Sequence, residues 1–390
     1  MYSKMTDAQL LVTPVPGVEL RFAHVNGVRL RYASSGPADG PLVLLVHGWP
    51  ELWFSWRHQL RALGAAGFRA VAPDCRGYGG SDAPERREAY DCATVCADMV
   101  ALLRHELLRE RAILVGHDWG AILGWQLCLL EPQRFVAYCG MSVPPMFHTP
   151  VSPMKGFAQR FGRGDDGVFF YIPYHNETHA ARDAASGATV PASAYGDEAA
   201  ADHGPAEDEY DGDVEGTLRR LYLLGAQSSV AALRRTDAPV EEFQPRGAGG
   251  RAGWLPRLPA VPEDLPAWLP ARDLAYFVGE YARRGFRGGV NYYRNFERNW
   301  RLLAPLAGRQ LEQPVMFLSG EEDMVLYSYG GKENVRKVVE GNVANLERCV
   351  WLEDTGHWCQ QEKPAEVNEA LLAFVQRHAP LLQAERVARL

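Results

Sequence analysis

The feature that most restricts the fold of this chain is an alternation of short apolar runs with helix-like segments near both ends. Residues 41–47 (PLVLLVH) form a continuous apolar run, which is typical of a strand buried on both faces of a sheet. Alternation of this kind predicts an α/β fold, in which a mostly parallel sheet carries helices on both faces. With 390 residues, the chain is long enough to bury a large core.

The pattern assigns strands and helices on either side of a long central region. The predicted strands are 18–24, 28–33, 41–47, 68–73, 111–116, 135–141, 314–319 and 347–352. The predicted helices are 54–63, 90–107, 119–130, 332–339 and 365–378. Asn26-Gly27 separates the first two strands and predicts a hairpin turn.

The alternation fails between about residues 145 and 300. Helical pieces remain at 168–174, 216–224 and 274–284, whereas 180–212 and 238–270 are rich in Ala, Gly, Asp, Glu or Pro and predict surface loops. We therefore expect a core domain formed by 18–144 and 301–390, with 145–300 inserted as a helical cap over the sheet.

Composition and charge exclude several classes of protein. The net charge of −7 argues against nucleic-acid binding, and no apolar run is long enough to span a membrane. Seven cysteines form no CxxC pair, and the first residues lack the build of a signal peptide, so we expect a cytoplasmic protein. The final Ala388-Arg389-Leu390 resembles a peroxisomal address, but the same residues are abundant throughout the chain, so a chance match explains it equally well.

The stretch VGHDWGA at residues 115–121 carries the first chemical signal. Asp118 follows a predicted strand, precedes a predicted helix and lies between Gly116 and Gly120. This is the form of a nucleophile elbow, in which small flanking residues allow a strained turn and the central residue is usually a serine. The alternative is that Asp118 only caps the following helix.

A carboxylate at the elbow does different chemistry from a serine. It is ionised at neutral pH and can attack an electrophilic carbon directly, forming an alkyl-enzyme ester. Hydrolysis of that ester needs a general base and an oxyanion hole. His357 follows the last predicted strand and is the candidate base, since the chain order of nucleophile, acid and histidine suits this topology.

Two backbone amides are candidates for the oxyanion hole. One is that of Trp119, directly after Asp118, and the other is that of Trp49, in the loop after the strand at 41–47. The Trp49-Pro50 bond is a candidate for the cis isomer. His47 and His117 are expected to be structural, because neither follows the last strand.

Five segments together resemble the α/β-hydrolase-fold epoxide hydrolases: HGWPE (47–51), DCRGYGGSDAP (74–84), GHDWGA (116–121), GEEDMVL (320–326) and DTGHW (354–358). The resemblance implies an α/β-hydrolase fold with an inserted cap. The loop at 320–323 offers three carboxylates as the acid that orients His357, and the resemblance selects Asp323.

Two cap segments also resemble this family, VFFYIPY (168–174) and NYYRNFERNW (291–300). The resemblance implies that Tyr171 and Tyr293 point at the nucleophile, hold the epoxide oxygen and supply its proton, and that Phe169 lines the pocket. Tyr174 and Tyr292 are expected to fill the contact between cap and sheet.

The sequence therefore predicts an epoxide hydrolase that needs no metal or organic cofactor and acts on a small-molecule epoxide and water. One alternative is a haloalkane or haloacid dehalogenase that uses the same ester but needs no tyrosine acid. The other is a non-catalytic ligand-binding protein with the same fold. The preferred epoxide, its regio- and enantioselectivity, and the choice between monomer and homodimer stay open.

Overall fold

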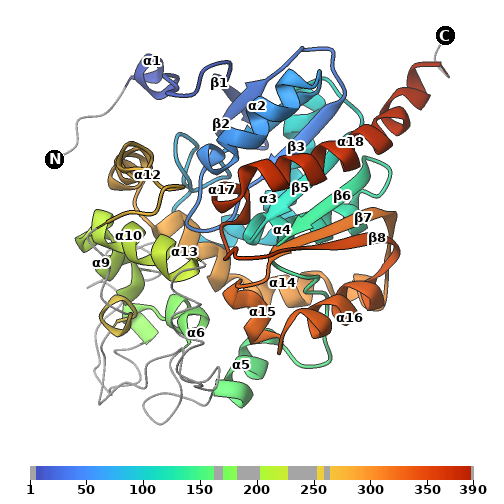
Figure 1. The fold of residues 1–390 in the computed structure, drawn as a ribbon. Coiled ribbons are helices and arrows are strands. Elements are labelled where there is room, and N and C mark those ends of the chain that lie inside the picture. The colour runs from blue at the N-terminus through green and yellow to red at the C-terminus, as the bar shows by residue number, and fades with distance from the viewer. Residues whose placement is uncertain (1–5, 162–169, 182–202, 227–252, 259–263, 388–390) are drawn as a thin grey trace.

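The computed structural model describes residues 6–161, 170–181, 203–226, 253–258 and 264–387. Its centre is one eight-stranded sheet with the order β1-β2-β4-β3-β5-β6-β7-β8 (Figure 1). β2 pairs antiparallel with β1 and with β4, and all other neighbours are parallel. The strands are β1 (Glu19–Val25), β2 (Val28–Ser35), β3 (Leu42–Val46), β4 (Arg69–Pro73), β5 (Ala112–His117), β6 (Phe135–Met141), β7 (Leu311–Gly320) and β8 (Val343–Leu352).

Helices cover both faces of the sheet, which confirms the predicted α/β-hydrolase fold (Figure 1). Those of the sheet domain are α2 (Arg57–Ala65), α3 (Cys92–Ala101), α4 (Trp119–Leu130), α15 (Met324–Ser328), α16 (Lys332–Asn342), α17 (Cys359–Glu362) and α18 (Pro364–Val387). Short helical segments add α1 (Asp7–Leu10), η1 (Trp53–Trp56), η2 (Arg87–Tyr90), η3 (Leu102–Glu106), η7 (Leu255–Arg257) and η8 (Ala304–Leu306). Among the described residues, no helix has the length and apolar character needed to cross a membrane.

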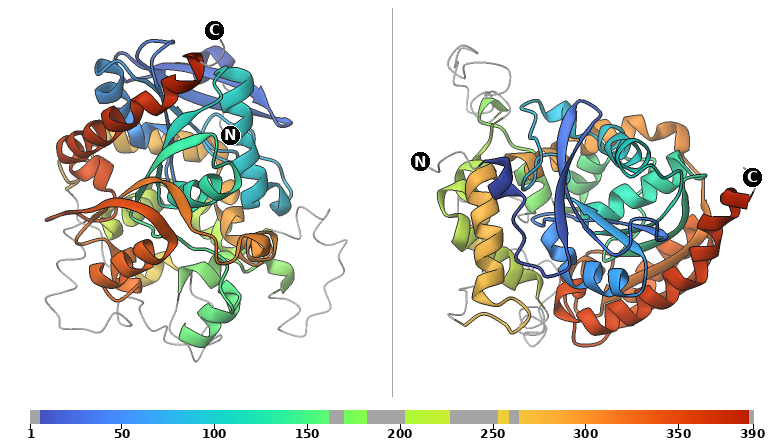
Figure 2. Two further views of the ribbon diagram at one scale, coloured as in Figure 1. Left: turned by 90° about the vertical axis from the view of Figure 1, so that its right-hand side faces the viewer. Right: turned by 90° about the horizontal axis from the view of Figure 1, so that it is seen from above.

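The helical cap is inserted between β6 and β7. Its helices are α5 (Pro153–Phe161), α6 (Tyr171–His175), α9 (Pro205–Gly212), α10 (Val214–Gly225), α12 (Ala271–Arg284), α13 (Arg287–Arg294) and α14 (Phe296–Leu302). Figure 2 shows α9, α10 and α12 on one side of the molecule and α18 on the other. We propose that residues 18–144 and 301–390 form the core domain and that residues 145–300 form the cap.

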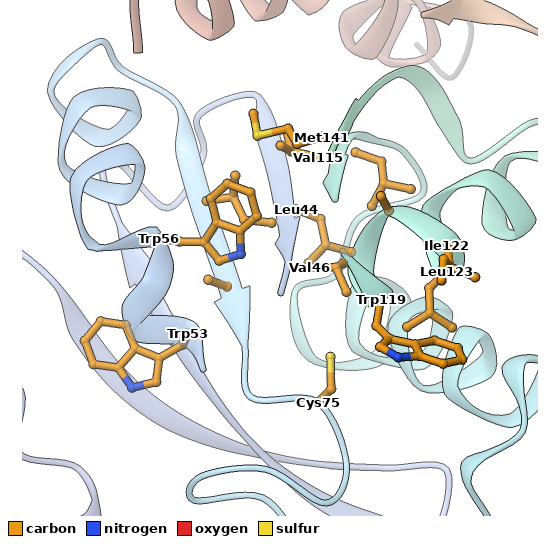
Figure 3. Packing of buried hydrophobic residues seen from close by; sticks show 14 of the residues in the cluster. Leu44, Val46, Trp53, Trp56, Cys75, Val115, Trp119, Ile122, Leu123 and Met141 are labelled. Atoms are coloured by element: carbon orange, nitrogen blue, oxygen red, sulfur yellow. The ribbon is translucent and has the colours of Figure 1, made fainter. Parts of the chain in front are cut away.

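The core lies where the central strands meet the helices packed on them. All five residues of β3 and all six of β5 are buried. Figure 3 shows Leu44, Val46, Val115 and Met141 from the central strands, with Trp56 and Ile122 from flanking helical segments. Uninterrupted burial explains why the apolar run at 41–47 needs no polar alternation. The rigid sheet holds the loops at the carboxyl ends of its strands in place.

Local sequence explains several element boundaries. Asn26 and Gly27 both have positive φ, +48° and +75°, as the predicted two-residue hairpin requires. The predicted helix 90–107 divides into α3 and the π-helical turn η3. Asp91 caps α3, because its side chain accepts a 2.8 Å hydrogen bond from the Thr94 amide.

Two segments that the sequence predicted to be surface loops are instead packed and contain buried side chains. Residues 205–212 form α9, in which the Tyr210 side chain is fully buried. Trp254 is also buried, with its indole stacked on Tyr171. The prediction of surface loops was wrong here because the partners that cover these side chains are distant in sequence. Residues 182–202 and 227–252 lie outside the described part of the chain.

Candidate active site

Asp118 occupies a strained turn between β5 and α4. Its φ of 53° and ψ of −118° lie outside the regions that non-glycine residues ordinarily adopt. A Cβ on Gly116 would lie 2.2 Å from the Gly120 carbonyl oxygen, and one on Gly120 would lie 2.0 Å from that of Val46. Glycine is therefore required at both flanking positions, as the elbow pattern predicted.

The side chain of Asp118 does not cap the helix that follows it. Its Oδ1 instead accepts a 2.8 Å hydrogen bond from the backbone amide of Trp49. The Trp49-Pro50 peptide bond is cis. Trp119 begins α4, and its amide is one of the helix's first four, which have no intrahelical acceptor. Both amides proposed for the oxyanion hole thus come from segments next to the carboxylate.

His357 joins Asp118 to a second carboxylate. Its Nδ1 lies 3.0 Å and 3.1 Å from the two carboxylate oxygens of Asp323, and its Nε2 lies 3.7 Å from Oδ2 of Asp118. Burial lowers the pKa of His357, but the charges of Asp323 and Asp118 outweigh it and hold this pKa well above its usual value. An imidazole between two buried carboxylates is suited to carrying a proton.

Among the three carboxylates of the 320–323 loop, Asp323 contacts His357. It is buried at the N-terminus of α15, where Oδ1 also accepts a 2.9 Å hydrogen bond from the Val325 amide. Burial raises the pKa of Asp323, but the positive charge and hydrogen bond of His357 outweigh it and lower this pKa. Glu321 pairs with Lys332 instead, and Glu322 accepts from the Tyr327 hydroxyl.

The backbone of His357 is held from several sides. Its amide donates to the Gly225 carbonyl in the cap at 2.7 Å. Its carbonyl lies 2.8 Å from Nε2 of His117 and accepts from the Ser142 hydroxyl at 3.2 Å. His117 also contacts Glu51, and His47 accepts from the Cys75 amide, so both histidines have the structural contacts expected of them.

Tyr171 and Tyr293 come from α6 and α13 of the cap and line the same cavity as Asp118 and His357. Their rings meet edge to face with centroids 5.7 Å apart. Burial is the largest cause that raises the pKa of each phenol, and the charge of Asp118 adds to it. Both hydroxyls therefore stay protonated and can donate hydrogen bonds.

The neighbouring tyrosines make structural contacts. The Tyr292 hydroxyl donates to the Arg76 carbonyl of the sheet domain at 3.0 Å. The Tyr174 hydroxyl donates within the cap to Pro205 and Glu209. The Tyr292 contact agrees with the expected position between cap and sheet, whereas the hydroxyl of Tyr174 is bonded inside the cap.

A second cavity shares Asp118, Tyr171 and Tyr293 with the first and continues between α5 and α14 past Ile122 and Phe296. Phe170 lines both cavities, whereas Phe169 lies outside the described residues. Most of the remaining lining is aromatic or aliphatic, including Trp254, Leu221, Leu224, Met146 and Phe157. The carboxylate therefore lies between two largely apolar chambers.

Three features in or next to the pocket were not predicted from the sequence. Trp254 lines the pocket from within a Pro/Gly-rich stretch, where a tryptophan is itself a signal of burial. Gly48 lies against the nucleophile, since a Cβ there would be 2.3 Å from Oδ1 of Asp118. His175 is fully buried, with its ring centroid 4.5 Å from that of Tyr293. No local pattern marks His175.

Comparison with known proteins agrees with this geometry. Residues 41–182 match the family model described as alpha/beta hydrolase fold. The chain is 40% identical to Epoxide hydrolase A of Mycobacterium tuberculosis over 356 residues, covering 91% of this chain and 96% of that protein. It is 34% identical to Epoxide hydrolase 3 of Siraitia grosvenorii over 356 residues, covering 91% and 97%.

Solved structures give the same result. The crystal structure of Epoxide Hydrolase A from Mycobacterium thermoresistibile superposes with a TM-score of 0.76 at 39% identity, covering 92% of this chain and 98% of that one. An epoxide hydrolase from an endophytic Streptomyces gives 0.76 at 34% identity, covering 93% and 96%. With the elbow aspartate, the histidine and the cap tyrosines gathered around one pocket, the chain belongs to the epoxide hydrolases of the α/β-hydrolase fold.

Proposed function

We propose that this protein converts epoxides to vicinal diols through a covalent ester on Asp118. The observation that carries the proposal is the position of one strained carboxylate, with His357 beside it and two protonated phenols lining the same cavity. The epoxide hydrolases to which the chain is similar supply the reaction class.

In the first step, the Asp118 carboxylate attacks one epoxide carbon from the side opposite the C–O bond that breaks. The electron pair of that bond passes to the epoxide oxygen, which becomes an alkoxide. Tyr171 and Tyr293 hold this oxygen by hydrogen bonds, and one of them supplies its proton. Their burial removes competing water from the phenols.

In the second step, water activated by His357 attacks the carbonyl carbon of the ester. Formation of the ester removes the negative charge of Asp118, which is one of the two charges that raise the pKa of His357. The imidazole therefore releases its proton more readily at this stage and becomes a competent base. Asp323 keeps Nδ1 protonated, so that Nε2 is the atom that accepts the proton from water.

The tetrahedral oxyanion of this step is stabilised by the amides of Trp49 and Trp119. The Trp49 amide already donates to Oδ1 of the carboxylate, so Oδ1 is the oxygen we expect to become the oxyanion. Collapse of the intermediate breaks the bond between the ester carbon and the alkyl oxygen, and the proton of the new carboxylic acid passes to that oxygen, so the diol leaves and the Asp118 carboxylate is restored. The proton that His357 released after ring opening restores the phenol that protonated the epoxide oxygen.

The test is a single turnover with excess enzyme in heavy-oxygen water. The oxygen delivered to carbon comes from the Asp118 carboxylate, so the first diol should be unlabelled, and label should enter Asp118 itself. Full labelling of the first diol would mean direct attack by water, and the ester mechanism would be wrong. Peptide mass spectrometry of the recovered enzyme locates the label independently.

A further inference from the structure

Two histidines and an aspartate of the cap come together outside the active-site cavities. Nε2 of His179 lies 2.7 Å from Oδ2 of Asp208, and Nε2 of His203 lies 2.8 Å from Oδ1 of the same carboxylate. The two imidazole rings stack with their centroids 5.8 Å apart. The three ligand atoms all lie within 4.8 Å of one another.

Backbone contacts hold these residues in place. The His179 amide donates to the His203 carbonyl at 3.0 Å, which pairs the segment after α6 with the segment before α9. Gly204 permits this approach, since a Cβ there would lie 2.1 Å from the Glu177 carbonyl oxygen. Asp208 lies in the first turn of α9 and therefore keeps a defined position relative to His203.

The donor set suits a transition metal ion. Two imidazole nitrogens and one carboxylate oxygen are a common three-residue set for Zn²⁺, which leaves the fourth tetrahedral position for water. Metal–ligand distances of about 2.0–2.2 Å require ligand atoms about 3.3 Å apart, so small side-chain rotations suffice to place an ion between the three groups. The histidine side chains are about one-third exposed and that of Asp208 is 58% exposed, so the cluster is open to solvent.

We propose that His179, His203 and Asp208 form a binding site for a divalent transition metal ion such as Zn²⁺. The bound ion crosslinks two cap segments that are separated by the undescribed residues 182–202. Joining two segments that are distant in sequence through metal ligands restricts the unfolded chain and stabilises the folded cap.

The site acts on stability rather than on chemistry. None of the three residues lines the two active-site cavities. The link to the active site is indirect: Glu207, next to Asp208, forms a buried ion pair with Arg294, which follows Tyr293 in α13. Metal binding should therefore stabilise the packing of α9 against α13, the helix that carries Tyr293.

The test uses the full chain without a polyhistidine tag, freed of metal by chelation and dialysis, and titrated with Zn²⁺ against a chromophoric chelator. We expect one equivalent to bind with a dissociation constant of about 1 µM or lower. Thermal unfolding should shift to higher temperature with added Zn²⁺. Substituting Co²⁺ should produce visible absorption bands of a tetrahedral site.

The variants His179→Gln and His203→Gln should lose that equivalent, the absorption bands and the thermal shift. His24→Gln removes an exposed histidine of β1 and is the matched control that should behave as the parent protein. All three should keep epoxide turnover measured without metal, which verifies that they fold. Binding that survives in both cluster variants, or no stoichiometric binding by the parent, would overturn the proposal and leave the cluster as a set of hydrogen bonds.

Discussion

Nε2 of His357 and Oδ2 of Asp118 lie 3.7 Å apart, near enough for strong electrostatic attraction but too far for a good hydrogen bond. Nδ1 of the same ring is 3.0 Å from Asp323. The imidazole is thus fixed by one carboxylate and lines the same cavity as the other. In the proposed mechanism, water that enters this cavity meets both the base and the ester carbonyl carbon.

Replacing His357 with glutamine should separate the two chemical steps. Asp118 can still open the epoxide, but the ester persists because a general base contributes about 10²–10⁴-fold to such a step. Intact-protein mass spectrometry should show a mass increase equal to that of the substrate. The double variant His357→Gln/Asp118→Ala should show none. A His357→Gln enzyme that neither turns over nor gains mass would assign His357 to the first step instead.

Removing either cap hydroxyl should slow ring opening. Tyr171→Phe and Tyr293→Phe should each reduce kcat by about 10²-fold, because the alkoxide loses a donor. The matched control is Tyr292→Phe, which deletes a hydroxyl bonded to the Arg76 carbonyl. It should cost about 1 kcal/mol of stability and leave kcat unchanged. If the parent protein and the three variants had equal kcat, Tyr171 and Tyr293 would have no role in the mechanism.

The His357 pKa predicts how stability depends on pH. The pKa is raised in the folded protein, so the folded state binds the proton more tightly than the unfolded state, whose value is about 6.5. This contribution is complete below about pH 6.5 and is lost as the pH rises through the folded-state pKa. Urea unfolding of the parent should therefore show a fall in stability above about pH 6.5 that His357→Gln lacks. Parallel curves for the two proteins would contradict the assigned direction of the shift.

Gly48→Ala should inactivate the enzyme without unfolding it. The added methyl would meet Oδ1 of Asp118 at 2.3 Å, so the carboxylate must leave its hydrogen bond with the Trp49 amide. We expect kcat to fall by about 10²-fold or more, as for loss of one oxyanion-hole donor. Gly279→Ala is the control, since a Cβ at that exposed position in α12 meets nothing within 4 Å. It should raise stability by about 0.5–1 kcal/mol and leave turnover intact. An active Gly48→Ala enzyme would show that the position of Oδ1 is not critical.

The sheet domain was predictable because its signals are local. Continuous apolar runs mark β3 and β5, and the glycines at 116 and 120 mark a turn that no larger residue can make. α4 and β6 have the predicted bounds, while β7 and β8 begin earlier than predicted, since strand ends depend on the neighbouring strand. The Asp118, His357 and Asp323 cluster follows from this topology, which brings the carboxyl ends of parallel strands together.

The cap was harder to predict because its burial comes from distant partners. Trp254 is covered by Tyr171, and Glu207 is paired with Arg294. Neither contact produces a periodic apolar pattern in the surrounding sequence. Trp254 and Glu207 therefore lie in stretches that the sequence predicted to be loops. The cluster of His179, His203 and Asp208 was not predicted for the same reason: its members come together only in the folded cap, and their spacing in the sequence matches no known metal-ligand pattern.

By itself, the sequence determined the sheet, the elbow and the identities of the groups able to do chemistry, because apolar periodicity and tight turns act over a few residues. Residue patterns left three acidic residues open as the partner of His357, and only the family resemblance selected Asp323 and the two cap phenols. The tertiary structure decided the contact of Asp323 with His357, the position of the phenols at the cavity and the packing of the cap. Those outcomes depend on contacts between segments far apart in the chain, so the free energy that stabilises them cannot be predicted from the sequence of one segment.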